Sequence, residues 1–127
     1  MCLRKVIDIY NPPLKDIKVG YKFFVRNAKN ELSYWYADMH GKPKRYDWNE
    51  DLNKFRLKGC DSFYPTGYHI YDSLSAIGNF KFSIEREIYK VEYTDIIVKG
   101  MNLGMGSEGE NSHLCFVARK FRILEKV

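Results

Sequence analysis

His69 is the leading candidate for a functional side chain in this sequence. It lies in the stretch 67–71, directly after Tyr68. Imidazole titrates near neutral pH, so His69 could act as a general base. It could also hold a nucleotide, with Tyr64 and Tyr71 stacking on the base. The alternative interpretation is a core or edge histidine whose ring is satisfied by a backbone carbonyl.

Cys2 is the second candidate. Removal of Met1 would leave an amino-terminal cysteine, which holds a thiol nucleophile and its own amine base on one residue. Some amidotransferases and abasic-site binding proteins that begin Met-Cys-Gly use this arrangement. Leu3 takes the place of that glycine here, so the motif is absent. The alternative interpretation is an incidental thiol at a frayed terminus.

Basic residues gather in two parts of the chain, in the segment 42–45 and near the C-terminal end. Together with nearby aromatic rings they could bind single-stranded nucleic acid by charge and stacking. Four acidic residues between positions 38 and 51 dilute this positive field, so we favour a solvated face of mixed charge. The residues that we expect to contact a ligand or partner in these regions are Trp35, Lys42, Lys44, Arg45, Trp48 and Arg119.

The remaining motifs argue against several classes of enzyme. The glycine-rich stretch 100–109 lacks the GK[ST] ending of a phosphate-binding loop and carries Glu108, so we expect a loop that orders on a partner. No HExxH, GxSxG, CxxC or paired-carboxylate pattern occurs. The three cysteines Cys2, Cys60 and Cys115 are widely spaced, which is typical of reduced thiols in a cytoplasm. We therefore expect neither a metal nor a cofactor.

Composition predicts one globular domain spanning residues 1–127. Apolar residues make up 45% of the chain and aromatic residues 16%, enough for a real core. No apolar run approaches the roughly 20 residues that a membrane span needs, and the charged N-terminus does not read as a secretory signal. The net charge of +5 is compatible with an anionic partner without requiring one. We expect a soluble, cytoplasmic protein.

The pattern of apolar residues predicts a mostly antiparallel sheet. A polar turn at 27–30 joins two strands, a bend is expected at Thr94 and Asp95, and Asn11-Pro12-Pro13 is expected to end the first strand. Arg119 interrupts an apolar face, which predicts a bulge or a buried ion pair there. The strands are expected at 3–10, 21–26, 31–38, 67–71, 87–93, 96–98 and 114–127, with a further one near 80–84.

Short helices are expected to pack on this sheet. Asp72 or Ser73 can cap a helix that runs to about Ile77, before the stop at 78–79. The segment 39–63 predicts either a helix near 48–55 or a strand near 54–57, with a mobile basic turn at 42–45. The predicted fold class is α+β, a mostly antiparallel sheet with one or two short helices packed on it.

The chain resembles small uncharacterised proteins of phages and mobile elements. The resemblance covers mainly residues 63–127 and rests on the start Met1-Cys2-Leu3, the stretch 67–71, residues 88–93 and the closing residues 117–123. It implies an accessory phage protein that counters host defence. The chain is also similar, more weakly, to ADP-ribosyltransferase-like folds, although it lacks their arginine, serine and glutamate triad in the expected order.

Two hypotheses about function follow. The leading one is a non-catalytic, phage-encoded binding protein whose partner is a host defence protein, such as a CRISPR effector, or a nucleotide second messenger. Its contact residues would include Tyr64, Tyr68, His69 and Tyr71. The alternative is a small enzyme that uses His69 or Cys2 on a nucleotide or protein substrate. Nucleic acid is not the favoured partner, and no membrane partner is expected.

Overall fold

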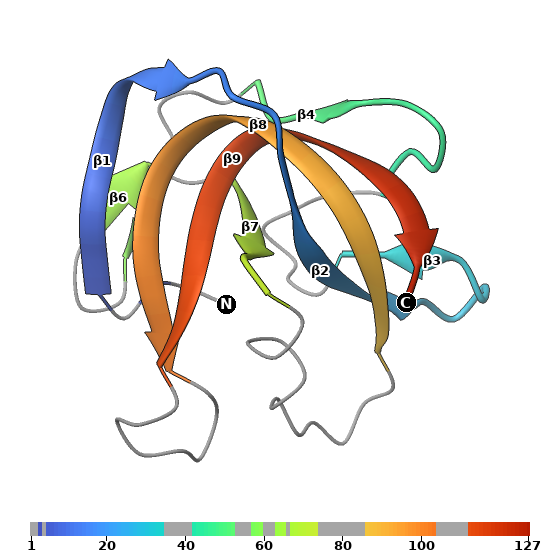
Figure 1. Cartoon of the computed structure of the whole chain (residues 1–127). Coiled ribbons are helices and arrows are strands. Elements are labelled where there is room, and N and C mark those ends of the chain that lie inside the picture. The colour runs from blue at the N-terminus through green and yellow to red at the C-terminus, as the bar shows by residue number, and fades with distance from the viewer. Residues whose placement is uncertain are drawn as a thin grey trace.

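Strands form the secondary structure of the described part of the chain (Figure 1). The computed structural model describes residues 3, 5–34, 42–52, 57–59, 63–65, 67–73, 86–103 and 112–127. The nine strands in these ranges are β1 (Lys5–Leu14), β2 (Lys18–Arg26), β3 (Leu32–Ser33), β4 (Asn49–Glu50), β5 (Leu57–Gly59), β6 (Phe63–Pro65), β7 (Tyr68–Tyr71), β8 (Glu87–Leu103) and β9 (Ser112–Lys126).

The predicted α+β class is wrong, because the described residues contain strands and no helix. The antiparallel sheet is confirmed, since every strand pairing is antiparallel. Asp72 and Ser73, expected to cap a helix, form a bend after β7, and the rest of that helix lies outside the described residues. Both residue types stabilise turns as readily as caps. Within the described ranges, no helix is long and apolar enough to cross a membrane.

The long strands β8 and β9 each occupy two positions in the main sheet, which lets the sheet close on itself. Residues 87–93 of β8 pair with β2, and residues 96–101 pair with β1. Residues 115–118 of β9 pair with β7, and residues 120–121 pair with β4. Because β8 also pairs with β9, and β2 with β7, the strands β2, β8, β9 and β7 form a closed ring. Figure 1 shows β8 and β9 arching side by side over β7.

The arch bends at the predicted place. Asp95 has a positive φ of 54°, and the register between β8 and β9 shifts between Ile96 and Val98. The extra residue lies on β8, opposite the position near Arg119 where a bulge was predicted. Asp95 forms an ion pair with Lys15, which holds the connection between β1 and β2 against the bend in β8.

Two predicted strand ends are wrong. β1 continues through Asn11, Pro12 and Pro13, because it is an edge strand in which a proline without an N–H forfeits no ladder bond. β8 continues through Gly100 to Leu103, where a loop was expected. The remainder of the glycine-rich stretch, from 104 to 109, lies outside the described residues.

The expected hairpin between β2 and β3 is confirmed over its described length. The Asn27 side-chain oxygen accepts hydrogen bonds from the backbone N–H groups of Lys29 and Glu31, both at 2.9 Å. Asn30 takes the left-handed conformation, with φ of 61°. β3 then pairs with β2 through Leu32 and Ser33, and residues 35–38 of the predicted strand lie outside the described residues.

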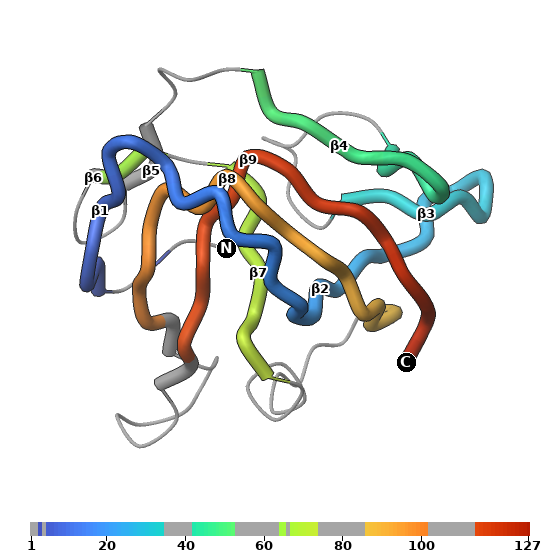
Figure 2. The backbone as a smooth tube through the Cα atoms, turned by 45° about the horizontal axis from the view of Figure 1, so that its top comes forward, coloured from blue at the N-terminus to red at the C-terminus, as the bar shows by residue number. Residues whose placement is uncertain are grey.

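The ring of strands separates two apolar clusters. The inner cluster includes Phe24, Tyr68, Tyr89 and Phe121, whose rings contact one another edge to face or tilted. The outer cluster gathers Leu3, Phe23, Tyr64, Tyr71, Ile97, Val98, Cys115 and Val117. Successive side chains of a strand point to opposite faces, so β7 supplies Tyr68 to one cluster and Tyr71 to the other. Figure 2 shows β7 running between the arch and β2, where it borders both.

Candidate functional site

Tyr64 connects the start of the chain to His69. Its hydroxyl accepts a hydrogen bond from the backbone N–H of Leu3 at 2.8 Å, and it lies 2.9 Å from Nε2 of His69. The two rings meet edge to face, with centroids 6.0 Å apart. Tyr64 and Leu3 are buried, whereas His69 is partly exposed. The buried Tyr64 hydroxyl therefore connects the buried Leu3 backbone to a side chain that reaches the surface.

This contact connects His69, one predicted catalytic candidate, through Tyr64 to Leu3, the residue that follows the other candidate in the sequence. Cys2 lies outside the described residues, but it is joined by a peptide bond to the Leu3 nitrogen that donates to Tyr64. The sequence suggested Cys2 and His69 separately and gave no signal that Tyr64 links them. A tyrosine hydroxyl can both accept and donate, which is what a relay between an amide and an imidazole requires.

The three tyrosines expected to contact a ligand are all buried core residues. Tyr64 and Tyr71 each expose 1% of their surface and Tyr68 exposes 7%. Tyr71 stacks on Phe23, and Tyr68 packs against Phe121 with centroids 4.7 Å apart. These rings are therefore packed against protein, and His69 is the one partly exposed side chain of this group.

Lys22 is a polar residue of the inner face that the sequence did not single out. It lies on β2 between Tyr21 and Phe23, on the same face as Phe24. Its ammonium donates to the carbonyl oxygen of His69 at 3.0 Å and lies about 6 Å from the rings of Phe24, Tyr68 and Phe121. The ring faces favour the cation, so Lys22 ties β2 to the backbone of β7 at His69.

Arg119 is almost fully buried, with 8% of its surface exposed. Its guanidinium donates to the backbone oxygen of Asp51 at 3.4 Å, and its own carbonyl accepts the Asp51 N–H at 2.8 Å. Arg119 thus extends the pairing of β4 with β9 by one more residue, a structural role that the sequence did not predict for it.

The segment that contains β4 presents large side chains to solvent. Tyr46 exposes 94% of its surface and Leu52 exposes 75%. Between them in the chain, Trp48 is half-buried, and the guanidinium of Arg122 stacks over its ring with Cζ 5.0 Å from the ring centroid. We call Tyr46, Trp48, Leu52 and Arg122 the anchor surface. β4 is the short edge strand of the main sheet, so nothing in the described residues pairs with its outer side.

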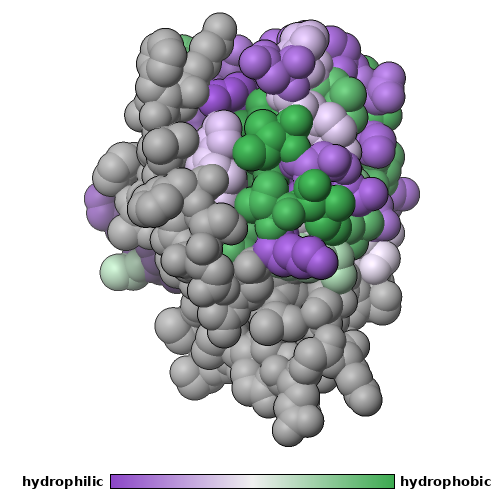
Figure 3. All heavy atoms as spheres, turned by 90° about the vertical axis from the view of Figure 1, so that its left-hand side faces the viewer, coloured by the Kyte–Doolittle hydropathy of each residue, from purple (hydrophilic) through white to green (hydrophobic). Residues whose placement is uncertain are grey.

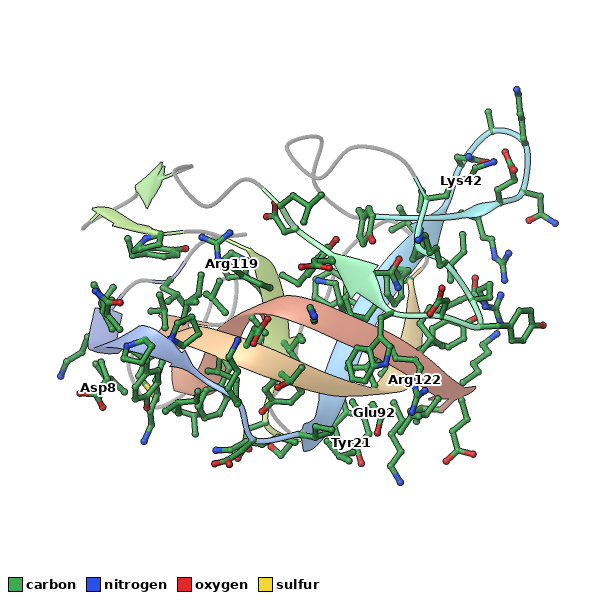
Figure 4. All side chains as sticks on the ribbon, turned by 90° about the horizontal axis from the view of Figure 1, so that it is seen from above. Asp8, Tyr21, Lys42, Glu92, Arg119 and Arg122 are labelled. Carbon is green, nitrogen blue, oxygen red and sulfur yellow. The ribbon has the colours of Figure 1, made fainter. Side chains whose placement is uncertain are left out.

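Two contacts fix the geometry of the anchor surface. Arg122 also forms an ion pair with Glu92 of β8, and Figure 4 shows these two side chains together. The buried side chain of Asn49 accepts the Lys44 N–H at 2.7 Å and donates to the Lys44 carbonyl at 3.2 Å. These contacts hold the turn at 44–49 in a definite shape, so Tyr46 projects from a braced loop.

The predicted basic residues do not meet in one patch. Lys42 forms an ion pair with Glu31 at the β2–β3 hairpin, and the Arg45 guanidinium lies over the ring of Tyr89, 5.1 Å from its centroid. Figure 4 shows Arg119 far from both Lys42 and Arg122. Lys44 is exposed, and Trp35 lies outside the described residues. The positive charges are therefore spread over several elements and partly neutralised.

Within the part of the chain that the structure describes, no three His, Cys, Asp or Glu side chains lie close enough together to hold a metal ion. Searches of family models, curated proteins and solved structures find no match to this chain. Any assignment of function must therefore come from the two sites themselves, the Tyr64–His69 contact and the anchor surface.

Proposed function

We propose that this chain is a non-catalytic binding protein that docks a protein partner through the anchor surface. The observation that carries the proposal is Tyr46, a large aromatic side chain that is 94% exposed on a braced turn. A tyrosine ring offers a large, rigid contact area with a polar tip, and such rings are enriched where proteins meet. Tyrosine, tryptophan and arginine are also the residue types that contribute most to protein–protein affinity.

The composition of the anchor surface suits a protein more than a nucleotide. Tyr46, Trp48 and Leu52 provide aromatic and aliphatic anchors, and Glu50, which lies between Trp48 and Leu52 in the chain, forms an ion pair with Lys120 of β9. An apolar centre with a polar rim is the usual anatomy of a transient interface. Arg122 already shares its charge with Glu92, which leaves little net positive charge for a phosphate group.

The resemblance to phage accessory proteins suggests the kind of partner. We propose a component of host defence, such as a CRISPR effector, met in the cytoplasm of the host. Sequestration of such a component needs affinity and shape but no chemistry. A nucleotide second messenger held near His69 is the other partner that this setting suggests, and the burial of Tyr64, Tyr68 and Tyr71 makes it the less favoured one.

An enzyme that uses Cys2 or His69 is the second candidate function, and one observation favours it. The hydrogen bonds from Leu3 to Tyr64 and between Tyr64 and His69 place a titratable ring beside the chain position that follows Cys2. In this enzyme His69 would act as the proton acceptor for the Cys2 thiol.

A photo-cross-linking residue at position 46 tests the docking surface in cells that carry the defence system. We expect a host protein to be cross-linked from position 46 and not from position 17, because the exposed Ile17 lies next to β2, which β8 and β9 separate from β4. With the purified partner, Tyr46→Ala should weaken binding about tenfold, as expected for an anchor worth ~1.4 kcal/mol. Ile17→Ala is the matched control and should leave the affinity unchanged.

A titration of the purified partner with this protein distinguishes a binding protein from an enzyme. A sequestering protein inactivates its partner at about one equivalent, and Cys2→Ala and His69→Gln should keep this effect. Equal cross-linking from positions 46 and 17, or unchanged affinity of Tyr46→Ala, would refute the docking surface. Inactivation far below one equivalent that is lost in Cys2→Ala or His69→Gln, with the fold intact, would establish the enzyme instead.

A further inference from the structure

Three cationic side chains gather around one carboxylate where β2, β8 and β9 lie side by side. Glu87, at the start of β8, accepts two hydrogen bonds from the Arg26 guanidinium and lies 2.9 Å from Nζ of Lys126. Glu87 Oε1 also accepts from the Tyr89 hydroxyl at 3.4 Å, and the Arg45 guanidinium lies over the ring of Tyr89, 5.1 Å from its centroid. We call Arg26, Arg45 and Lys126 the basic cluster.

The basic cluster holds more positive than negative charge. Hydrogen bonds from Arg26 and Lys126 lower the pKa of Glu87 to about 2, so this carboxylate is ionised at neutral pH and offsets one of the three positive charges. Lys44, which is exposed, is offset by Asp47 in the same turn. Other charges form pairs of opposite sign, namely Lys42–Glu31, Lys120–Glu50, Arg122–Glu92 and the cross-strand neighbours Lys90 and Glu125. The surplus of positive charge therefore belongs to the basic cluster.

Arg45 joins the basic cluster to the anchor surface. It directly precedes Tyr46 on the turn that Asn49 holds in shape. Its side chain is exposed, and within the described residues its guanidinium forms no hydrogen bond or ion pair. The ring of Tyr89, itself 2% exposed, favours the cation above it. The N–H groups of Arg45 therefore remain available for a bidentate bond to a carboxylate.

We propose that the protein partner of the anchor surface carries acidic side chains beside the apolar site that receives Tyr46, and that their carboxylates bind the basic cluster. This inference rests on the proposed docking function and adds the charge of the partner to it. Tyr46 and Leu52 require an apolar partner surface, so the anions next to it are the Asp and Glu side chains of a protein. Charges at the rim of an interface mainly speed association, whereas buried anchors slow dissociation.

The β1 side of the molecule supplies a control position. Figure 3, which faces that side, shows apolar atoms gathered among polar ones. Lys5 is an exposed lysine of β1 and pairs with Met101, at the other end of β8 from Glu87. Lys5→Glu therefore changes the net charge by the same amount as Arg45→Glu and leaves the basic cluster intact.

A hexaglutamate peptide tests the basic cluster before the partner is known. In NMR titrations of the full chain at low ionic strength, we expect shifts of the amide signals of residues 26, 45 and 126, with a Kd on the order of 1 mM. Arg45→Glu should raise this Kd at least about fivefold, and Lys5→Glu should change it less than about twofold. The absence of these shifts, or an equal effect of both variants, overturns the proposal. So does tighter binding of a single-stranded hexanucleotide at the same residues, which would assign the cluster to nucleic acid.

The host protein that is cross-linked from position 46 provides the second test. With this partner purified, Arg45→Glu should lower the association rate constant about tenfold and reduce its dependence on salt, whereas Tyr46→Ala should mainly raise the dissociation rate constant. If the partner docks through Tyr46 but associates equally fast with Arg45→Glu and Lys5→Glu, the docking function stands and the acidic partner is refuted. If hexaglutamate binds the cluster but position 46 cross-links no partner, the docking function fails, and the assignment of its partner fails with it.

Discussion

At the scale of single residues, burial decides which candidates can meet a ligand. Tyr64 was expected to stack on a base, but its ring is closed in the outer cluster and its hydroxyl holds Leu3 and His69. Arg119 was expected to contact a partner, but it fastens β4 to β9 through Asp51. Tyr46, which the sequence suggested only as one of several rings that could stack on nucleic acid beside the basic residues, is the most exposed large hydrophobic side chain among the described residues.

Cys115 gives a direct test of residue burial. It is fully buried in the outer cluster, and desolvation raises the pKa of its thiol to about 12. At pH 8 only roughly one thiol in ten thousand is then ionised, and the thiolate is the species that reacts. We expect iodoacetamide to leave Cys115 unlabelled in the native protein and to label it in guanidinium, as measured by peptide mass spectrometry. Labelling of native Cys115 at the rate of a free thiol would contradict its place in the core.

At the scale of elements, two strands of unusual length shape the molecule. β8 and β9 pair along almost their whole length, and their shared bend at Asp95 lets each strand contribute to both sides of the ring. β2 enters this ring at Gly20, where a strand and two side chains approach closely. Glycine is required at that point for space.

The change Gly20→Ala tests this close approach. The added Cβ would lie 2.6 Å from the Tyr71 carbonyl oxygen and 2.9 Å from a methyl carbon of Ile70. Because backbone cannot move aside cheaply, we expect a loss of about 2–3 kcal/mol in the free energy of unfolding, measured by urea denaturation. Val19→Ala, at the neighbouring exposed position, is the control and should cost less than 1 kcal/mol. Equal stability of the two variants would show that β2 can shift away from β7.

Alternation of apolar residues was enough to predict most of the sheet. The strands at 21–26, 67–71 and 87–93 were found because each repeats with a period of two. Gly100 shows why the rest was missed. It was interpreted as the start of a loop, but it lies inside β8, where a Cβ would come within 2.6 Å of Leu3, so the glycine is needed there for space. A sequence reveals that a glycine is present and not whether the backbone or a neighbour needs it.

The site was harder to predict than the fold for a related reason. Aromatic residues on β7 suggested stacking on a ligand, yet β7 lies between the inner and the outer cluster, so Tyr68 and Tyr71 are both buried. Closure depends on pairings between strands that are far apart in the sequence, such as β2 with β8. Local patterns carry no information about such pairings.

At the scale of the whole molecule, ion pairs connect the ends of strands that meet only in the folded state. Glu87 at the start of β8 accepts from Arg26 of β2 and from Lys126 of β9, the latter at 2.9 Å. These hydrogen bonds lower the pKa of the Glu87 carboxyl from 4.5 to about 2. A carboxyl with a lowered pKa stabilises the fold while ionised, above about pH 4.5, and loses that contribution as pH falls toward 2.

Glu87→Gln should therefore change how the free energy of unfolding depends on pH in the acid range. We expect the variant to be less stable than wild type by about 1 kcal/mol at pH 7, since the ion pairs are partly solvated. The difference should shrink toward zero as pH falls from 4.5 to 2, in thermal unfolding measured across that range. Glu125→Gln, an exposed control on β9, should follow the wild-type curve. A constant difference between Glu87→Gln and wild type at all pH values would exclude this linkage.

The double use of β9 also has a consequence for the nascent chain. β9 follows the other described strands in the chain and so leaves the ribosome after them, yet β4, β7 and β8 all pair with it. Until it emerges, the inner faces of the earlier strands have no complete sheet to cover them. Folding must then wait until β9 has emerged and proceed through contacts between distant segments, which is slow. The interval leaves apolar strands open to aggregation or to chaperones, so slow release from the ribosome would lower the yield of folded protein.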